Sequence, residues 1–301
     1  MRSNERSRDE AFAVQQPDVK AFFDESTNTF SYVVWDPATR KAAVIDSVLD
    51  YDAVSGRTHR DSANALVDFV KAQALEVEWV IDTHVHADHL SAAPYVQSVL
   101  GGKLAIGEHI RDVQETFGKI FNAGSDFARD GSQFDHLFKD GEHYRVGTIE
   151  AVAMHTPGHT PACMTHVIGD AAFVGDTLFM PDYGTARCDF PGGDARTLYR
   201  SIQRIFALPD DIRIFLCHDY KTSDRDTFVH ETTVGDERRS NIHVREGTDE
   251  EAFVRMRRTR DATLSMPRLL LPSVQVNMRA GQFPPAEANG TSYLKIPLDT
   301  M

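Results

Sequence analysis

The sequence contains few cysteines: three in 301 residues, at Cys163, Cys188 and Cys217. No two of them form a CxxC motif, and an odd number cannot be fully paired within one chain. This excludes a dense disulfide framework and is typical of proteins kept in a reducing compartment. For Cys163 and Cys217, which flank the segments described below, we expect the role of small buried side chains.

Long hydrophobic runs are also missing. No apolar stretch approaches the roughly 20 residues that cross a bilayer, and residues 1–6 lack the apolar core of a secretory signal. We therefore expect a cytoplasmic protein that does not bind a membrane. Residues 1–16 are expected to form a flexible tail and residues 17–301 a single domain.

Basic residues are outnumbered, with 32 Lys and Arg against 45 Asp and Glu, and the formal net charge is −13. Nucleic-acid binding requires a basic face, so this balance argues against a nucleic-acid partner. It does not exclude a small anionic ligand held by one local arginine. Hydrophobic residues make up 41% and charged residues 26% of the chain, as in ordinary globular proteins.

The apolar patterning predicts a chain that mixes strands and helices. The predicted strands are 30–35, 42–45, 77–81, 103–106, 142–155 (a pair turning near Gly147), 162–168, 171–174 and 212–217. The predicted helices are 63–75, 91–100, 111–121, 194–208, with Asp194 as N-cap, and 249–263. The polar residues 50–61 are interpreted as a loop. After Pro267, Pro and Gly recur, which favours irregular structure packed on the domain.

The densest group of chemically active side chains lies at residues 83–89, Thr-His-Val-His-Ala-Asp-His. Three histidines and one aspartate fall within the six residues from His84 to His89. The apolar run before them is predicted to be a buried strand that ends just before His84. Open α/β sheets tend to place their chemistry at such strand ends. Imidazole and carboxylate at this density indicate a metal site.

Further segments supply the same kinds of ligand: Thr-Pro-Gly-His-Thr at 156–160, Val-Gly-Asp-Thr at 174–177 and Cys-His-Asp-Tyr at 217–220. Each follows a predicted strand, so we expect all of them to meet at one sheet edge. Neutral imidazole and carboxylate suit Zn, Fe or Mn. Gly158 and Gly175 would let the backbone turn tightly, so that the next side chain points at the metal.

Taken singly, these later segments favour other interpretations. An isolated His159 is more typical of a turn or of the surface, and an isolated Asp176 of a helix or turn cap. The dense first segment, followed by the others in chain order, favours the metal site instead.

The order HxHxDH, PGHT, GDT and HDY resembles the metallo-β-lactamase fold superfamily. The resemblance spans residues 30–220 and implies an α/β (α+β) fold, the αββα sandwich, with the metal at one edge of its two sheets. Residues 17–301 would then form one metallo-β-lactamase-like domain with a C-terminal extension.

Within the superfamily the chain is most similar to persulfide dioxygenases, in particular to their bacterial β-lactamase-like hydrolase branch. The features that carry this are Gly-Asp-Thr-Leu-Phe at 175–179, Ala-Arg-Cys-Asp-Phe at 186–190, Thr-Leu-Tyr-Arg-Ser at 197–201 and Asn-Met-Arg at 277–279. The sequence departs from the family pattern at Ala186 and Cys188, where Gly and Thr are usual, which leaves the identity of the thiol substrate open.

The resemblance implies one Fe(II) per chain, held by His84, His159 and Asp176, since two histidines and a carboxylate leave open positions suited to O2 chemistry. It implies an enzyme of sulfide detoxification that oxidises glutathione persulfide, or a similar low-molecular-weight persulfide, with O2 to sulfite and thiol. It also makes a homodimer plausible. The remaining polar residues of the motifs would orient the ligands or hold a second metal: His86, Asp88, His89 and His218.

Two catalytic or substrate-binding residues are also implied. Arg187 would bind a glutathione carboxylate with its planar fork, and Tyr220 would hydrogen-bond near the open face of the metal. A surface ion pair for Arg187 and a packed aromatic role for Tyr220 are the alternatives.

The same ligands could instead bind two zinc ions. His84, His86 and His159 would bind the first zinc ion, and Asp88, His89 and His218 would bind the second. Asp176 would bridge the two ions, as in thioester hydrolysis of the glyoxalase II type. That enzyme holds glutathione with basic C-terminal helices, which Arg255, Arg257, Arg258 and Arg260 could imitate, although a solvated helix face is the favoured interpretation. A non-catalytic metal or sulfide sensor is a third class, against which the intact ligand set argues.

Overall fold

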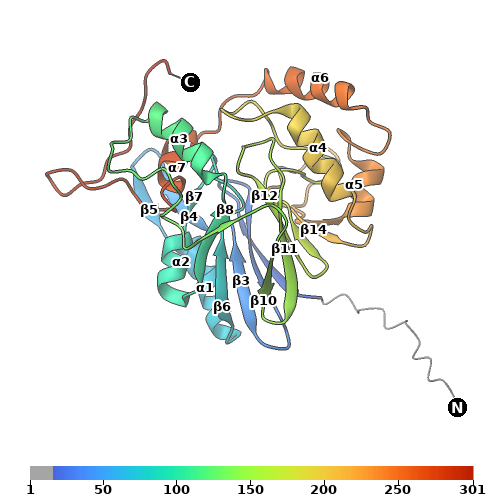
Figure 1. Cartoon of the computed structure of the whole chain (residues 1–301), viewed down its shortest axis with the longest axis horizontal. Helices are drawn as coiled ribbons and strands as arrows, with labels where there is room; N and C mark the ends of the chain where they lie inside the picture. The colour runs from blue at the N-terminus through green and yellow to red at the C-terminus, as the bar shows by residue number, and fades with distance from the viewer. Residues whose placement is uncertain (1–15, 301) are drawn as a thin grey trace, which may run out of the picture.

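The computed structural model describes residues 16–300 (Figure 1). The predicted flexible tail, except Gln16, lies outside the described residues. Two six-stranded sheets form the centre of the molecule. The first has the order β1 (Asp18–Asp24), β2 (Thr29–Trp35), β3 (Lys41–Ile45), β6 (Glu76–Ile81), β8 (Lys103–Gly107) and β9 (His136–Phe138). The second has the order β10 (Glu142–Val146), β11 (Ile149–His155), β12 (Met164–Ile168), β13 (Ala171–Phe173), β14 (Arg213–Phe215) and β15 (Glu231–Thr233).

Helices cover the outer face of each sheet, as Figure 1 shows. On the first sheet lie α1 (Asp61–Ala72), α2 (Ala93–Leu100), α3 (Ile110–Ile120) and α7 (Leu270–Asn277). On the second lie α4 (Ala195–Phe206), α5 (Val234–Ser240) and α6 (Glu250–Asp261). Between the sheets a third apolar cluster joins residues such as Tyr32 and Ile45 to Phe173 and Phe215. The predicted αββα sandwich is therefore confirmed.

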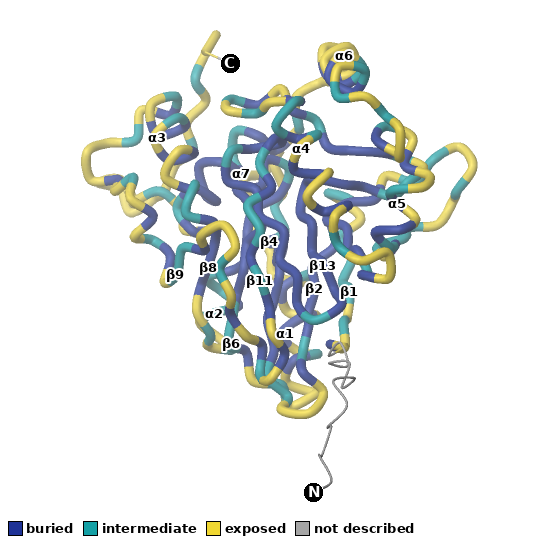
Figure 2. Tube along the Cα trace, turned by 45° about the vertical axis from the view of Figure 1, so that its right-hand side comes forward, coloured by how far each residue is buried: buried dark blue, intermediate teal, exposed yellow. Residues whose placement is uncertain are grey.

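Burial follows this layering. The strands in the middle of the sandwich are buried and the outer helix faces and loops are exposed (Figure 2). Helix α4 illustrates why: Leu198, Ile202 and Ile205 lie on its sheet-facing side, and the side chain of Asp194 accepts a hydrogen bond from Thr197 N. The predicted helix and its N-cap are confirmed.

Residues 50–61 are not the loop that their polarity suggested. They contain most of β4 (Val48–Asp52) and all of β5 (Arg57–His59), which pair as a hairpin, and β4 also pairs with β7 (Leu90–Ser91). The turn is made by Asp52, whose carboxylate accepts hydrogen bonds from Val54 N and Ser55 Oγ. Every β5 residue is exposed, so the hairpin shows little of the apolar alternation that marks a half-buried strand.

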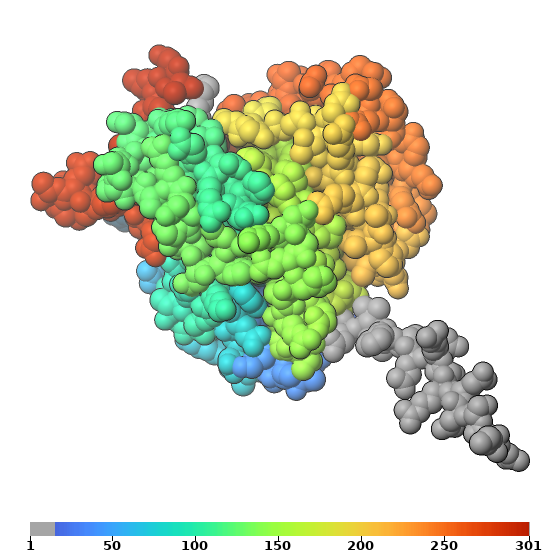
Figure 3. All heavy atoms as spheres, viewed as in Figure 1, coloured from blue at the N-terminus to red at the C-terminus, as the bar shows by residue number. Residues whose placement is uncertain are grey.

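The segment after Pro267 is also more ordered than predicted, because it contains α7. Pro272 lies in the first turn of that helix, where a missing N–H costs no intrahelical hydrogen bond. Leu270, Val274 and Val276 pack into the core of the first sheet, so the predicted docking of the tail is confirmed. Figure 3 shows the last described residues (red) on the side of the molecule that carries α3. Among the described residues, no helix is both long enough and apolar enough to span a bilayer.

One set of hydrogen bonds joins the two sheets directly, and it allows a first prediction. The buried carboxylate of Asp36, after β2, accepts hydrogen bonds from Thr148 N at 2.8 Å and Thr148 Oγ1 at 2.7 Å in the β10–β11 turn. It also accepts one from Thr39 Oγ1. Burial alone would raise the pKa of Asp36, but the hydrogen bonds from Thr148 and Thr39 lower it well below its usual value.

We expect Asp36→Asn to lower the free energy of unfolding by about 1–3 kcal/mol at pH 7, since hydrogen bonds to a buried charge are lost. A carboxylate with a depressed folded-state pKa stabilises the fold above its unfolded pKa of 3.8 and loses this effect as the pH falls. The difference between variant and wild type should therefore shrink from pH 7 towards pH 3 in urea unfolding. Asp68→Asn, at an exposed position, is the control. A difference that stays constant with pH would contradict this account.

Candidate metal centre

The four polar segments identified in the sequence meet at one edge of the sandwich, where strands of both sheets end. His84 follows β6, His159 follows β11, Asp176 follows β13 and His218 follows β14. All four side chains are buried. The predicted convergence is confirmed.

Two glycines allow the backbone to bring these side chains together. Gly158 has a φ of 141°, and a Cβ there would lie 2.4 Å from Leu198 Cα in α4. Gly175 has a φ of 50°, and a Cβ there would lie 2.6 Å from Thr83 Oγ1. Since an L side chain fits neither place, the glycines let His159 and Asp176 approach His84.

His84, His159 and Asp176 form a first group whose ligand atoms all lie within 4.8 Å of one another. Asp176 Oδ2 lies 3.5 Å from His159 Nε2 and 3.9 Å from His84 Nε2. Buried His84 Nε2 has no hydrogen-bond partner among the described residues. A buried polar atom without a partner is costly, and a bound metal ion would satisfy it. Two imidazoles and a carboxylate fit Fe(II) or Zn(II).

In both histidines of this group, Nδ1 forms a hydrogen bond and Nε2 faces Asp176. His159 Nδ1 lies 2.8 Å from the Arg187 carbonyl, so Nδ1 carries the proton and Nε2 keeps its lone pair for the metal. His84 Nδ1 lies 3.1 Å from Thr83 Oγ1, which in turn bonds to Asp46. Burial, followed by the charge of His86, holds the pKa of His84 well below its ordinary value. A neutral imidazole is the form that binds metal.

Asp88 and His89 form a group with His86, and His218 lies next to Asp88; Asp88, His89 and His218 are called the second group below. His218 Nε2 lies 3.2 Å from Asp88 Oδ2 and 3.2 Å from Asp176 Oδ1. His89 Nε2, Asp88 Oδ2 and His218 Nε2 are buried and lack hydrogen-bond partners among the described residues. Burial lowers the pKa of His89 to about 4, so its ring is neutral at pH 7. Asp176 therefore lies between two sets of potential ligands.

His86 has a buried partner that the sequence analysis missed. Its Nε2 lies 2.9 Å from Oδ1 of buried Asp46, and His86 is not part of the group formed by His84, His159 and Asp176. Asp46 follows β3 as the recognised ligands follow their strands, and this position was the available signal. Asn277 was noticed only for its resemblance: its side-chain amide donates to the carbonyls of His86 and His89 and so fastens the HxHxDH loop to α7.

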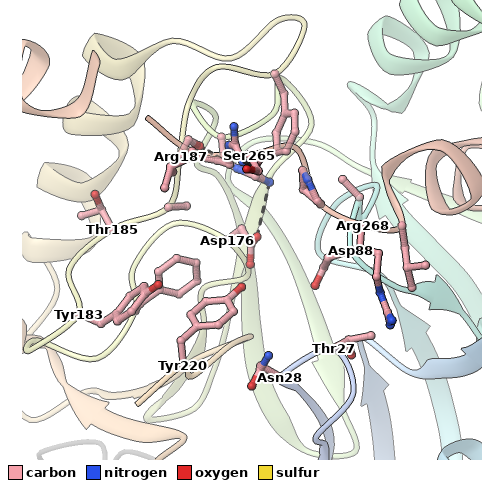
Figure 4. Close-up of a pocket in the computed structure, with 18 of the residues that line it drawn as sticks. Thr27, Asn28, Asp88, Asp176, Tyr183, Thr185, Arg187, Tyr220, Ser265 and Arg268 are labelled. Carbon is pink, nitrogen blue, oxygen red and sulfur yellow. Dashed lines mark hydrogen bonds and ion pairs between the residues drawn. The ribbon is translucent and has the colours of Figure 1, made fainter. Parts of the chain in front are cut away.

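A cavity of ≈ 330 Å³ opens onto the first group. Figure 4 shows Asp176 at its centre, with Tyr183 and Tyr220 to one side and Asp88 and Arg268 to the other. The ring of Tyr220 packs 5.1 Å from that of Tyr183 and is partly exposed. Basic residues from the C-terminal part line the far wall: Arg257, Arg260 and Arg268.

Arg187 also lines this cavity, as expected for a substrate-binding residue, but much of its fork is engaged. Nε and Nη2 donate to the carboxylate of Asp189 at 2.6 and 2.7 Å, and Nη1 donates to the Ser265 carbonyl at 2.7 Å. Each terminal nitrogen keeps a further N–H. Arg187 therefore forms an ion pair with Asp189, as the alternative interpretation predicted, and also lines the cavity, as the substrate-binding interpretation predicted.

Comparison with known proteins agrees with this geometry. Residues 26–218 match the family model described as the metallo-beta-lactamase superfamily. A protein named as a probable metallo-hydrolase, from Burkholderia pseudomallei, is 57% identical over 94% of this chain and 99% of its own. A glyoxylase B2 of Dictyostelium discoideum is 47% identical over 93% of this chain and 97% of its own.

More distant relatives carry a different name. The human mitochondrial persulfide dioxygenase ETHE1 is 30% identical over 87% of this chain and 88% of its own. Among solved structures, that of ETHE1 from Myxococcus xanthus superimposes with a TM-score of 0.69 at 28% identity, covering 88% of this chain and all of that one. The relatives thus agree on the fold and divide between a hydrolase name and a dioxygenase name.

Proposed function

Because this chain belongs to the metallo-beta-lactamase superfamily, we propose that it is a persulfide dioxygenase with one Fe(II) per chain. Its substrate would be glutathione persulfide or a similar low-molecular-weight persulfide, converted with O2 and water to sulfite and thiol. The observation that carries the proposal is the group of His84, His159 and Asp176, two histidines and one carboxylate whose ligand atoms lie within 4.8 Å of one another, while His86 Nε2 is bound to Asp46. The likeness to the ETHE1 proteins supports it.

The residues of the site have distinct tasks in this proposal. His84, His159 and Asp176 would hold the iron, which when bound supplies the redox chemistry of oxygen transfer. Phe179 and Phe190 line the cavity and would keep water from the reacting sulfur. Tyr220, whose hydroxyl makes no hydrogen bond to the described residues, is free to donate to substrate.

Oxygen uptake tests the proposal. Protein purified anaerobically and loaded with Fe(II) is given glutathione persulfide, and O2 consumption and sulfite are followed together. We expect uptake matched by sulfite, and no uptake by the zinc-loaded protein or by His159→Ala. Absence of uptake at full iron loading would overturn the proposal for this substrate.

Arg187 allows a second prediction. We expect Arg187→Ala to raise the KM for glutathione persulfide by roughly tenfold or more, because a charge-assisted hydrogen bond to a carboxylate is lost. The substitution keeps the Arg187 carbonyl that accepts from His159, so kcat should change less than KM. Arg204→Ala, which removes a surface pair with Asp140, is the control. An unchanged KM would remove Arg187 from substrate binding.

A second function is supported by the second group. Asp88, His89 and His218 offer three buried ligand atoms without partners, enough for another metal bridged to the first by Asp176. Two zinc ions and a bridging hydroxide would favour thioester hydrolysis, in line with the names of the hydrolase-like relatives. Metal counts per chain and thioester cleavage after zinc loading decide between the two. Metal binding with neither activity would indicate a sensor.

The oligomeric state stays a separate proposal. Following the resemblance we propose a homodimer, and light scattering of the purified protein tests it.

A further inference from the structure

A buried ion pair lies outside both ligand groups and takes no part in the proposed chemistry. Arg257 and Asp261, one turn apart on α6, are only 1% and 4% exposed. Arg257 Nη2 and Nε donate to Asp261 Oδ1 at 2.6 and 2.9 Å. A solvated face was the favoured interpretation for the arginines of this helix. It holds for Arg255, Arg258 and Arg260 but is wrong for Arg257.

The ion pair forms hydrogen bonds to one neighbouring loop, residues 184–189, at two backbone positions. Asp261 Oδ2 accepts a hydrogen bond of 2.9 Å from Cys188 N. Arg257 Nη1 donates to the Thr185 carbonyl at 3.0 Å. The guanidinium and the carboxylate of the ion pair thus each also bind the backbone of this loop.

The same loop contacts His159 directly and the backbone next to Asp176. Arg187 lies between Thr185 and Cys188, and its carbonyl accepts a hydrogen bond of 2.8 Å from His159 Nδ1. Thr185 also forms a β-bridge with Leu178, and Ala186 N donates to the Thr177 carbonyl next to Asp176. Any shift of the loop would therefore move the acceptor behind His159.

Stability alone is a weak reason for such a pair. Desolvating two charges costs as much as their attraction returns, and well-packed apolar residues often serve equally well. Helix α6 is already docked by its buried residues Phe253 and Val254. The position of the Arg187 carbonyl, by contrast, depends on the backbone of the loop and therefore on the groups that hold this backbone in place.

We propose that Asp261 is a positioning residue: its hydrogen bond from Cys188 N holds the Arg187 carbonyl against His159 and so fixes the tautomer and the angle of that metal ligand, while Arg257 orients the Asp261 carboxylate and balances its charge. The inference rests on His159 as a metal ligand, as in the proposed function, and not on which reaction the metal serves. Replacing a group that orients a ligand typically weakens metal binding by about 10- to 100-fold.

Two double variants separate positioning from packing. Both R257M/D261N and R257M/D261L remove the ion pair, but only the first keeps an oxygen that can accept from Cys188 N. Co(II) affinity and the Co(II) absorption spectrum are measured for both, with the melting temperature of the metal-free proteins. We expect R257M/D261N to stay within a few-fold of wild type. R257M/D261L should bind Co(II) about 10- to 100-fold more weakly and show an altered spectrum.

Equal Co(II) affinity and equal spectra in the two variants would overturn the inference. If R257M/D261L does not fold, R257M/D261S replaces it, since the shorter serine hydroxyl does not reach Cys188 N. Cobalt binding is read without turnover. A failure of the dioxygenase proposal, which appears as absent O2 uptake in wild type, therefore leaves this result intact.

Discussion

Asp176→Asn is expected to weaken Fe(II) binding by more than about 100-fold and to abolish O2 uptake. Asp176 is the only carboxylate in the group with His84 and His159, and it supplies the negative charge that offsets the metal. Loss of an orienting partner alone costs about 10- to 100-fold in metal affinity, and loss of a ligand should exceed that range. Iron content after gel filtration and a titration with a competing chelator measure the effect.

Asp88→Asn is the matched control for this prediction. Both carboxylates lie 3.2 Å from His218 Nε2, yet only Asp176 is grouped with His84 and His159. In a one-iron enzyme Asp88→Asn should keep its iron. In a two-zinc enzyme it should lose about half of the metal. Full iron retention by Asp176→Asn would show that the first group is not the metal site.

The second large effect is expected from Asp46→Asn, which should lower the free energy of unfolding of the metal-free protein by about 3–5 kcal/mol. Asp46 accepts hydrogen bonds from Thr83 N at 2.7 Å and Thr83 Oγ1 at 2.9 Å, and its Oδ1 lies 2.9 Å from His86 Nε2. An amide offers one acceptor in place of two and no charge. Buried donors would then lose their partner.

The pH dependence of this loss of stability follows from the pairing of Asp46 with His86. Burial alone would lower the pKa of His86, but the charge and hydrogen bond of Asp46 raise it to about 9. Burial alone would raise the pKa of Asp46, and His86 lowers it well below its usual value. The contribution of His86 is fully present below its unfolded pKa of 6.5 and is lost as the pH rises through about 9. The contribution of Asp46 is present above its unfolded pKa of 3.8 and fades as the pH falls.

The difference between Asp46→Asn and wild type should therefore be largest between roughly pH 4 and 6.5 and should shrink by pH 10. Urea unfolding in the presence of a chelator measures it. Asp82→Asn is the matched control, since burial raises the pKa of Asp82 to about 7 and an amide resembles its protonated form. Equal losses in the two variants would show that charge on Asp46 is unimportant.

Much of the fold and of the first group follows from local sequence patterns. His84, His159, Asp176 and His218 each come directly after an apolar run, and the ends of such strands meet in an open sheet. Chemically distinctive residue types at strand ends therefore indicated where the candidate ligands meet, and the family resemblance implied which of them would hold the metal. The β4–β5 hairpin and α7 were missed because their patterns, an exposed edge strand and a helix with an internal proline, contradict the usual signals.

The sequence by itself determined that a metal site of histidines and aspartates lies at one edge of an αββα sandwich, because residue type and strand periodicity are local properties. Only the tertiary structure decided how the site is arranged. Asp46 binds Nε2 of His86, and Arg257 is buried against Asp261 although its neighbouring arginines on α6 are exposed. Both depend on partners far along the chain, and the direction of a ring nitrogen or the burial of a charge cannot be read from the neighbouring residues.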